Sequence, residues 1–214
     1  MTPFADRTDA GRRLVDPVCA VLPAGQPVTV VGLPRGGVVV GAAVVDGLRA
    51  VGRTARLDLV VVAKVLAPEH PELALGAVTD RATVRGEAAG WFTGTDDSRF
   101  RVLVDDARRR LAHRAAVLPP AVRPVDTPAL LVDDGLATGA TAEAAIAELR
   151  AAGAPWVGLA VPVADATAWR RVAQQVDAAV TLVTRRPMRA VSVDYQDFTQ
   201  LEDDVVLAAL ARYR

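Results

Sequence analysis

The feature that most constrains the fold is a series of five short apolar runs rich in β-branched residues. Segments with helical patterns separate most of these runs. Strands that alternate with helices along a chain favour parallel sheets with right-handed crossovers. We therefore predict an α/β fold whose central, mainly parallel sheet is flanked by helices. The predicted strands are VTVVGL (28–33), LDLVVVAKV (57–65), ALLVD (129–133), WVGLAVPV (156–163) and AAVTLVT (178–184).

The segments between these runs predict the helices and connections. Apolar residues three to four positions apart, together with stop signals such as Gly153, predict the helices. Residues 66–94 are broken by Pro and Gly and are interpreted as a mobile excursion or a hairpin, and 119–128 as a rigid connector. No repeat divides the chain, so residues 1–214 are expected to form one domain. The predicted helices are 6–22, 38–52, a charged and mostly exposed 96–118, 141–152, 166–176 and a short one at the end.

Composition excludes several classes of protein. The chain is 51% apolar and 23% charged, and its 25 basic and 25 acidic residues cancel. Such a balance leaves no electrostatic signal for nucleic acid or for an anionic membrane, although a local positive pocket remains compatible with it. Cys19 is the single cysteine, so no disulfide framework or thiolate metal site is expected. The N-terminus lacks the apolar segment of a secretory leader, so a cytoplasmic location is expected.

The segment DDGLATGAT (133–141) carries the most unusual chemistry. It follows a predicted strand, and ligands of parallel α/β folds bind beyond the carboxyl ends of the strands. Its small residues let backbone N–H groups approach an anion, and the helix that follows directs its positive end to the same place. The segment therefore predicts a phosphate-binding loop. The alternative is an ordinary turn between strand and helix with Thr141 as the N-cap.

Two common phosphate-binding motifs do not fit this segment. A nucleotide-hydrolase loop needs a lysine where Ala140 stands, and GLPRGG (32–37) lacks the glycine spacing of a dinucleotide fingerprint. The adjacent carboxylates of Asp133 and Asp134 could instead accept hydrogen bonds from two neighbouring hydroxyl groups. A sugar 5-phosphate with a free cis-diol meets both requirements.

The segment ALLVDDGLATGAT (129–141) resembles the phosphoribosyl-pyrophosphate (PRPP) signature of type I phosphoribosyltransferases. Its exact form is similar to that of bacterial phosphoribosyltransferase-like proteins whose substrate is unassigned. Further similarity to this group lies in FADRTDAGRRL, GLPRGGVVVG, LDLVVVAKVLAPEHPELALGAV and YQDFTQ, and so extends over most of the chain.

The resemblance implies a role for each matching residue. Asp133 and Asp134 would bind the ribose hydroxyls, and the loop after Pro34 would bind pyrophosphate, often with a strained or cis peptide. Arg35 suits a diphosphate because its guanidinium bonds phosphate bidentately, and Lys64 resembles a basic residue near pyrophosphate. The alternatives are a surface arginine in a tight turn and a lysine that only reaches solvent. Asp133, Asp134, Arg35 and Lys64 are thus the catalytic candidates. The PRPP-binding set adds Gly36, Gly37, Gly135, Ala137, Thr138, Gly139, Ala140 and Thr141.

The resemblance also implies a flexible catalytic loop and a small hood over the acceptor. Residues 66–94, with Arg81 and Arg85, occupy the position of the loop, although both arginines are also compatible with a solvated surface. Residues 185–200 are expected to contribute to the hood. Within them an aromatic side chain and a carboxylate would suit a heterocycle, and the alternative is a packing corner before the last helix. These acceptor candidates are Tyr195, Asp197 and Phe198.

The implied activity is Mg²⁺-dependent transfer of phosphoribosyl from PRPP to a small nitrogenous acceptor, with release of pyrophosphate. The metal would be held mainly by PRPP and water, because no side-chain metal cage is visible in the sequence. The expected partners are PRPP and an acceptor base, with a homodimer as the candidate assembly. Two alternatives stay open: a PRPP-binding regulator without transfer activity, and a hydrolase or phosphorylase acting on ribose phosphates.

Overall fold

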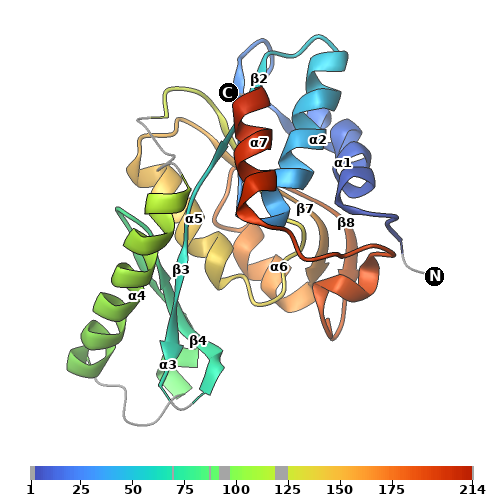
Figure 1. Cartoon of the computed structure of the whole chain (residues 1–214). Coiled ribbons are helices and arrows are strands. Elements are labelled where there is room, and N and C mark those ends of the chain that lie inside the picture. The colour runs from blue at the N-terminus through green and yellow to red at the C-terminus, as the bar shows by residue number, and fades with distance from the viewer. Residues whose placement is uncertain (1–2, 69, 87, 92–96, 119–124, 214) are drawn as a thin grey trace.

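A five-stranded parallel sheet forms the centre of the molecule (Figure 1). The computed structural model describes residues 3–68, 70–86, 88–91, 97–118 and 125–213. The strand order is β2-β1-β6-β7-β8, and every neighbouring pair is parallel, which confirms the predicted α/β fold. The strands are β1 (Val28–Gly32), β2 (Ala55–Leu59), β6 (Ala129–Val132), β7 (Val157–Asp165) and β8 (Ala178–Arg185).

Helices cover both faces of this sheet, so successive strand residues enter two different cores. In β1, Val30 packs with the helices of one face, whereas Val31 packs with those of the other. Burial on both faces explains why these strands are continuously apolar. One face carries α1 (Arg7–Val21), α2 (Gly36–Ala50) and α7 (Asp203–Tyr213), and the other carries α5 (Ala140–Ala151) and α6 (Ala166–Ala173).

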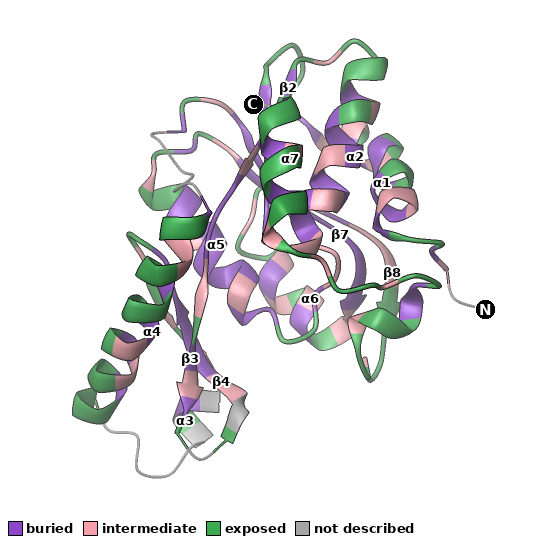
Figure 2. Ribbon diagram, viewed as in Figure 1, coloured by how far each residue is buried: buried purple, intermediate pink, exposed green. Residues whose placement is uncertain are grey.

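A second unit, here called the arm, projects from this body and comprises residues 63–117 (Figure 1). Its antiparallel sheet has the order β3-β4-β5, and α4 packs on that sheet through buried Phe100, Val104 and Leu111. The opposite face of α4 is exposed (Figure 2). Within the described ranges, no helix combines the length and the apolarity needed to cross a bilayer. The arm contains β3 (Ala63–Ala67), β4 (His70–Val78), β5 (Thr83–Arg85), α3 (Ala88–Trp91) and α4 (Asp97–Val117).

The predicted strand 57–65 is wrong as a single element. β2 ends at Leu59 in the parallel sheet, and β3 begins at Ala63 in the antiparallel one. Val60 and Val61 between them are still buried, so the apolar pattern continues although the hydrogen-bonding partner changes. Hydropathy reports burial and not pairing, which is why the sequence did not reveal the break.

The hairpin interpretation of residues 66–94 agrees with the described part of that segment. β4 pairs antiparallel with both β3 and β5. The predicted helix 96–118 is α4, and the final helix is α7. The predicted connector falls partly on residues 119–124, which lie outside the described residues.

A buried carboxylate joins the arm to the body. Glu148 of α5 is 2% exposed and accepts hydrogen bonds from Thr79 Oγ1 at 2.7 Å and from the Arg81 backbone N–H at 2.8 Å. The Arg81 guanidinium also pairs with it. Arg81, considered above as a catalytic-loop residue, therefore binds the turn between β4 and β5 to the helix that follows the phosphate-binding segment.

Glu148→Ala is expected to lower the free energy of unfolding by about 2–4 kcal/mol, because it removes the acceptor of the Arg81 N–H and leaves the buried Thr79 hydroxyl only the Ala82 carbonyl at 3.4 Å. Chemical denaturation measures the change. Glu202→Ala is the matched control, since the Glu202 side chain is 72% exposed. Equal stability of the two variants would contradict the anchoring role of Glu148.

Candidate functional site

The carboxyl ends of β1 and β6 lie side by side and carry the two predicted ligand-binding loops. Gly32 pairs with Val132, and the Leu33 N–H donates to the Val132 carbonyl at 3.0 Å. The peptide bond between Pro34 and Arg35 is cis. A Cβ atom at Gly36 would overlap the Asp134 carboxylate, so a larger residue there would displace Asp134 from its contact with Arg7.

The two aspartates are largely enclosed and lie next to each other. The Asp134 N–H donates to Asp133 Oδ1 at 2.9 Å. Burial and the neighbouring Asp134 charge raise the pKa of Asp133 well above its ordinary value, and the positive charges of Lys64 and Arg7 offset only part of this. Burial also raises the pKa of Asp134, against the opposing effect of Arg7. Both carboxylates would therefore gain from hydrogen-bond donors or a cation.

Arg7 is a site residue that the sequence did not identify. Its Nε donates to Asp134 Oδ2 at 2.8 Å, and the two side chains are 10% and 16% exposed. Its NH1 donates to the Thr199 carbonyl at 3.0 Å, and the guanidinium lies 3.7 Å from the centre of the Phe198 ring. No local pattern could have revealed this contact, because 127 residues separate Arg7 from Asp134.

The three acceptor candidates separate in the structure. Tyr195 is 4% exposed and its hydroxyl donates to the Asp134 carbonyl at 2.6 Å. It therefore holds the backbone of the acidic pair and does not line the cleft. Asp197 is exposed and caps its own turn by accepting from Thr199. Phe198 is the member of the three that lines the cleft described below. This segment, with the short 3₁₀ helix η1 (Val191–Asp194), packs on the body. That placement favours the packing-corner alternative.

The predicted phosphate-binding loop joins the acidic pair to α5. Ala137 and Thr138 are exposed, and Gly139 has φ +83°, where a side chain would be strained and would meet Val172. The helix then begins at Ala140, so its first N–H groups face the loop. Arg171 of α6 supports the loop by donating to the Thr138 carbonyl at 2.6 Å and to Glu143 at 2.8 Å.

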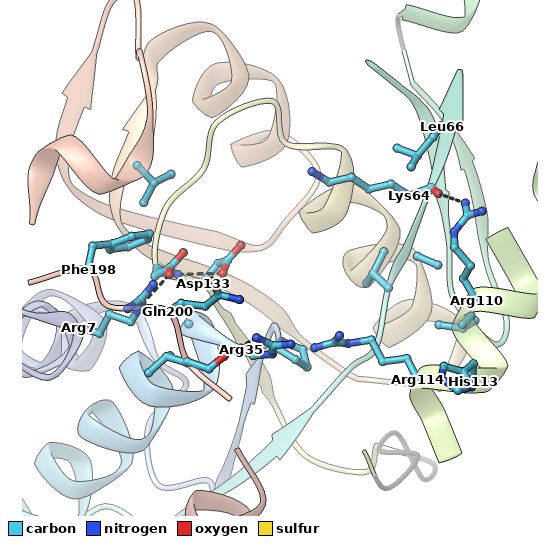
Figure 3. Close-up of a pocket in the computed structure, with 18 of the residues that line it drawn as sticks. Arg7, Arg35, Lys64, Leu66, Arg110, His113, Arg114, Asp133, Phe198 and Gln200 are labelled. Atoms are coloured by element: carbon cyan, nitrogen blue, oxygen red, sulfur yellow. Dashed lines mark hydrogen bonds and ion pairs between the residues drawn. The ribbon is translucent and has the colours of Figure 1, made fainter. Parts of the chain in front are cut away.

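A cleft of about 1230 Å³ lies between the loops of the body and the arm (Figure 3). Asp133, Asp134, Arg35 and Gly36 line one side, and Lys64 lines the other. The Lys64 side chain extends from β3 into the cleft (Figure 3). Lys64 was predicted at the end of a central strand. It belongs instead to β3 of the arm, which still brings it to the site.

Arg35 lines the cleft but is already paired. Its Nε donates to Asp203 Oδ1 at 2.9 Å, and its NH1 donates to the Leu201 carbonyl. The structure therefore brings only part of the predicted PRPP-binding residues to the cleft. Gly37 packs against the backbone of Asp133, and residues 137–141 are not among the residues that line the cleft. α4 also lines the cleft, through exposed Arg109, Arg110 and His113, half-buried Arg114 and buried Leu111.

Asp133→Asn is expected to raise the melting temperature of the ligand-free protein at neutral pH. The pKa of Asp133 is raised in the folded state, so its ionised form costs stability above the unfolded-state pKa of about 3.9. The gain should shrink as the pH falls towards 4, where the carboxyl group becomes protonated in both states. Each kcal/mol corresponds to about 2–4 °C for a protein of this size.

Thermal unfolding between pH 4 and pH 8 measures this effect. Asp16→Asn is the control, because Asp16 lies exposed on α1. A lower melting temperature for Asp133→Asn at pH 8 would contradict the unfavourable burial of this carboxylate.

Comparison with known proteins agrees with this geometry. The family model described as "Phosphoribosyl transferase domain" matches residues 22–196. A Mycobacterium tuberculosis protein named "Putative phosphoribosyl transferase Rv0571c" is 39% identical over 214 residues, which cover 98% of this chain and 46% of that protein. The chain thus spans about half the length of the curated relatives it matches. The crystal structure of TT1426 from Thermus thermophilus is 38% identical, covers 98% of each chain and has a TM-score of 0.74. The chain therefore belongs to the phosphoribosyl transferase domain family, a family of transferases, as its signature segment predicted.

Proposed function

We propose that the protein transfers phosphoribosyl from PRPP to a small nitrogenous acceptor and releases pyrophosphate. The observation that carries this proposal is the pair of partly buried carboxylates that precedes a glycine-containing helix start and opens onto a basic cleft. The two carboxylates can accept hydrogen bonds from the ribose hydroxyls, and the helix start a few residues later can bind the 5-phosphate of the same ligand. The acceptor is expected to be a nucleobase or a related heterocycle.

In the proposed mechanism each part of the site has a separate task. Asp133 and Asp134 accept hydrogen bonds from the ribose hydroxyls, and residues 137–141 bind the 5-phosphate through backbone N–H groups and the helix dipole. Arg35, Gly36 and Lys64 lie where the diphosphate would leave. As the C1–O bond breaks, its electron pair departs with the diphosphate. The acceptor nitrogen forms the new bond and loses a proton. Positioning and stabilisation of the leaving charge supply most of the rate.

The donor set fits Mg²⁺ bound together with the substrate. Within the described residues, no group of three His, Cys, Asp or Glu side chains could hold a metal ion. Two adjacent carboxylates with raised pKa values suit a cation whose remaining ligands are substrate oxygens and water. When bound, the ion would neutralise charge on the diphosphate.

A PRPP-binding regulator is the second candidate, and the pairing of Arg35 with Asp203 favours it. An arginine held by the C-terminal helix binds a diphosphate only if that pairing is exchanged. Pyrophosphate release measured against purines, pyrimidines and other azoles separates the two functions. If PRPP binds but no acceptor in the panel causes pyrophosphate release, the result would favour the regulator.

PRPP with Mg²⁺ is expected to stabilise the protein by about 2.7 kcal/mol at 100 times its dissociation constant, and chelation of the metal should reduce the effect. Thermal shift measures this. Asp133→Asn with Asp134→Asn should abolish the ligand-dependent shift, because the ribose and the metal lose both negatively charged acceptors, whereas Asp16→Asn should keep it. The absence of any shift at millimolar PRPP would contradict the proposed function.

A further inference from the structure

The inner face of α4 is part of the cleft, and the proposed PRPP site leaves it without a role. Arg109, Arg110, His113 and Arg114 line the cleft from this helix. Arg109 and His113 are four residues apart, as are Arg110 and Arg114, so both pairs lie on one side of the helix. Figure 3 shows Arg110, His113 and Arg114 across the cleft from Asp133 and Phe198.

Positive charge exceeds negative charge on this wall. Arg109 and Arg110 share a single carboxylate, Asp106, and Arg110 also donates to the Lys64 carbonyl at 2.9 Å. Arg114 donates to Asp203 at 3.3 Å, but Asp203 already accepts from Arg35. Among the described residues, six basic side chains and two acidic ones line the cleft.

The cleft is larger than one substrate requires. Its volume of about 1230 Å³ exceeds the roughly 300–1,000 Å³ that is usual for a small-molecule site. The proposed 5-phosphate loop, residues 137–141, lies outside the lining, and the diphosphate is assigned to the loop at Arg35 and Gly36. The space in front of α4 is therefore available for the second substrate.

We propose that the inner face of α4 binds the acceptor, and that the acceptor carries a carboxylate or phosphate group. Asp106 and Asp203 are each shared between two arginines, so the positive charge of this face is only partly compensated. An anionic group on the acceptor would complete this pairing, whereas a neutral base would not. Arginine side chains also bind such groups bidentately, which fixes orientation as well as charge. This inference rests on the proposed function and specifies its substrate class.

Matched acceptors that differ by one anionic group test the proposal. Orotate and uracil form one pair, and nicotinate and nicotinamide form another. Binding to the protein saturated with Mg²⁺ and PRPP is measured by calorimetry, or as KM where transfer occurs. In at least one pair the carboxylated member should bind at least ten times more tightly. Equal binding of both members in every pair, including no binding of either, would overturn the proposal.

The double variant Arg110→Gln with Arg114→Gln locates the effect. It should reduce the preference for the carboxylated member to less than twofold and leave PRPP affinity within threefold, and Lys at both positions should restore part of the preference. Arg108→Gln is the matched control: it makes the same change on the same helix, outside the lining, and should keep the preference.

Two results would assign the α4 face otherwise. A preference retained in the double variant would place the anion elsewhere. A double variant that loses PRPP or pyrophosphate affinity, with acceptor discrimination unchanged, would assign the face to the leaving group. Absence of PRPP binding by the unchanged protein is a separate outcome, and it would reject the proposed function itself.

Discussion

The ion pair between Arg7 and Asp134 is the interaction on which the rest of the site depends. Three distant parts of the chain meet there: α1 through Arg7, the loop after β6 through Asp134, and the C-terminal segment through Tyr195 and Thr199. Both charges are largely buried, and loss of one partner from such a pair costs about 3–5 kcal/mol. The pair thus holds the Asp134 carboxylate in place and keeps part of its charge compensated.

The two walls of the cleft differ in charge and in structural origin. The body supplies both acidic residues, Asp133 and Asp134, whose pKa values burial raises, together with Arg7 and Arg35. The arm supplies most of the basic wall, from β3 and α4. A substrate with a polyol and several anionic groups matches this division. Burial of these carboxylates costs stability. Such a cost is expected at positions where the residue is selected for ligand binding and not for the stability of the protein without ligand.

Most elements of the body followed from the sequence because their strands are buried on both faces and their helices have a clear period. The acidic pair and the proposed phosphate-binding loop could be singled out for a local reason, since all their residues lie within nine consecutive positions. The arm was predicted less well. The run 57–65 hides a change of sheet, and the arginines of α4 looked like a solvated face although half of them line a cleft.

The sequence by itself determined the fold class and the half of the site that is contiguous in the chain. Local geometry, glycine positions and the helix start suffice for that half. Only the tertiary structure decided that Arg7 reaches Asp134, that Tyr195 is a buried support, and that Lys64 and α4 face the acidic pair. These contacts join residues far apart in sequence, and they depend on how the arm and the two ends of the chain pack against the sheet, which no local pattern encodes.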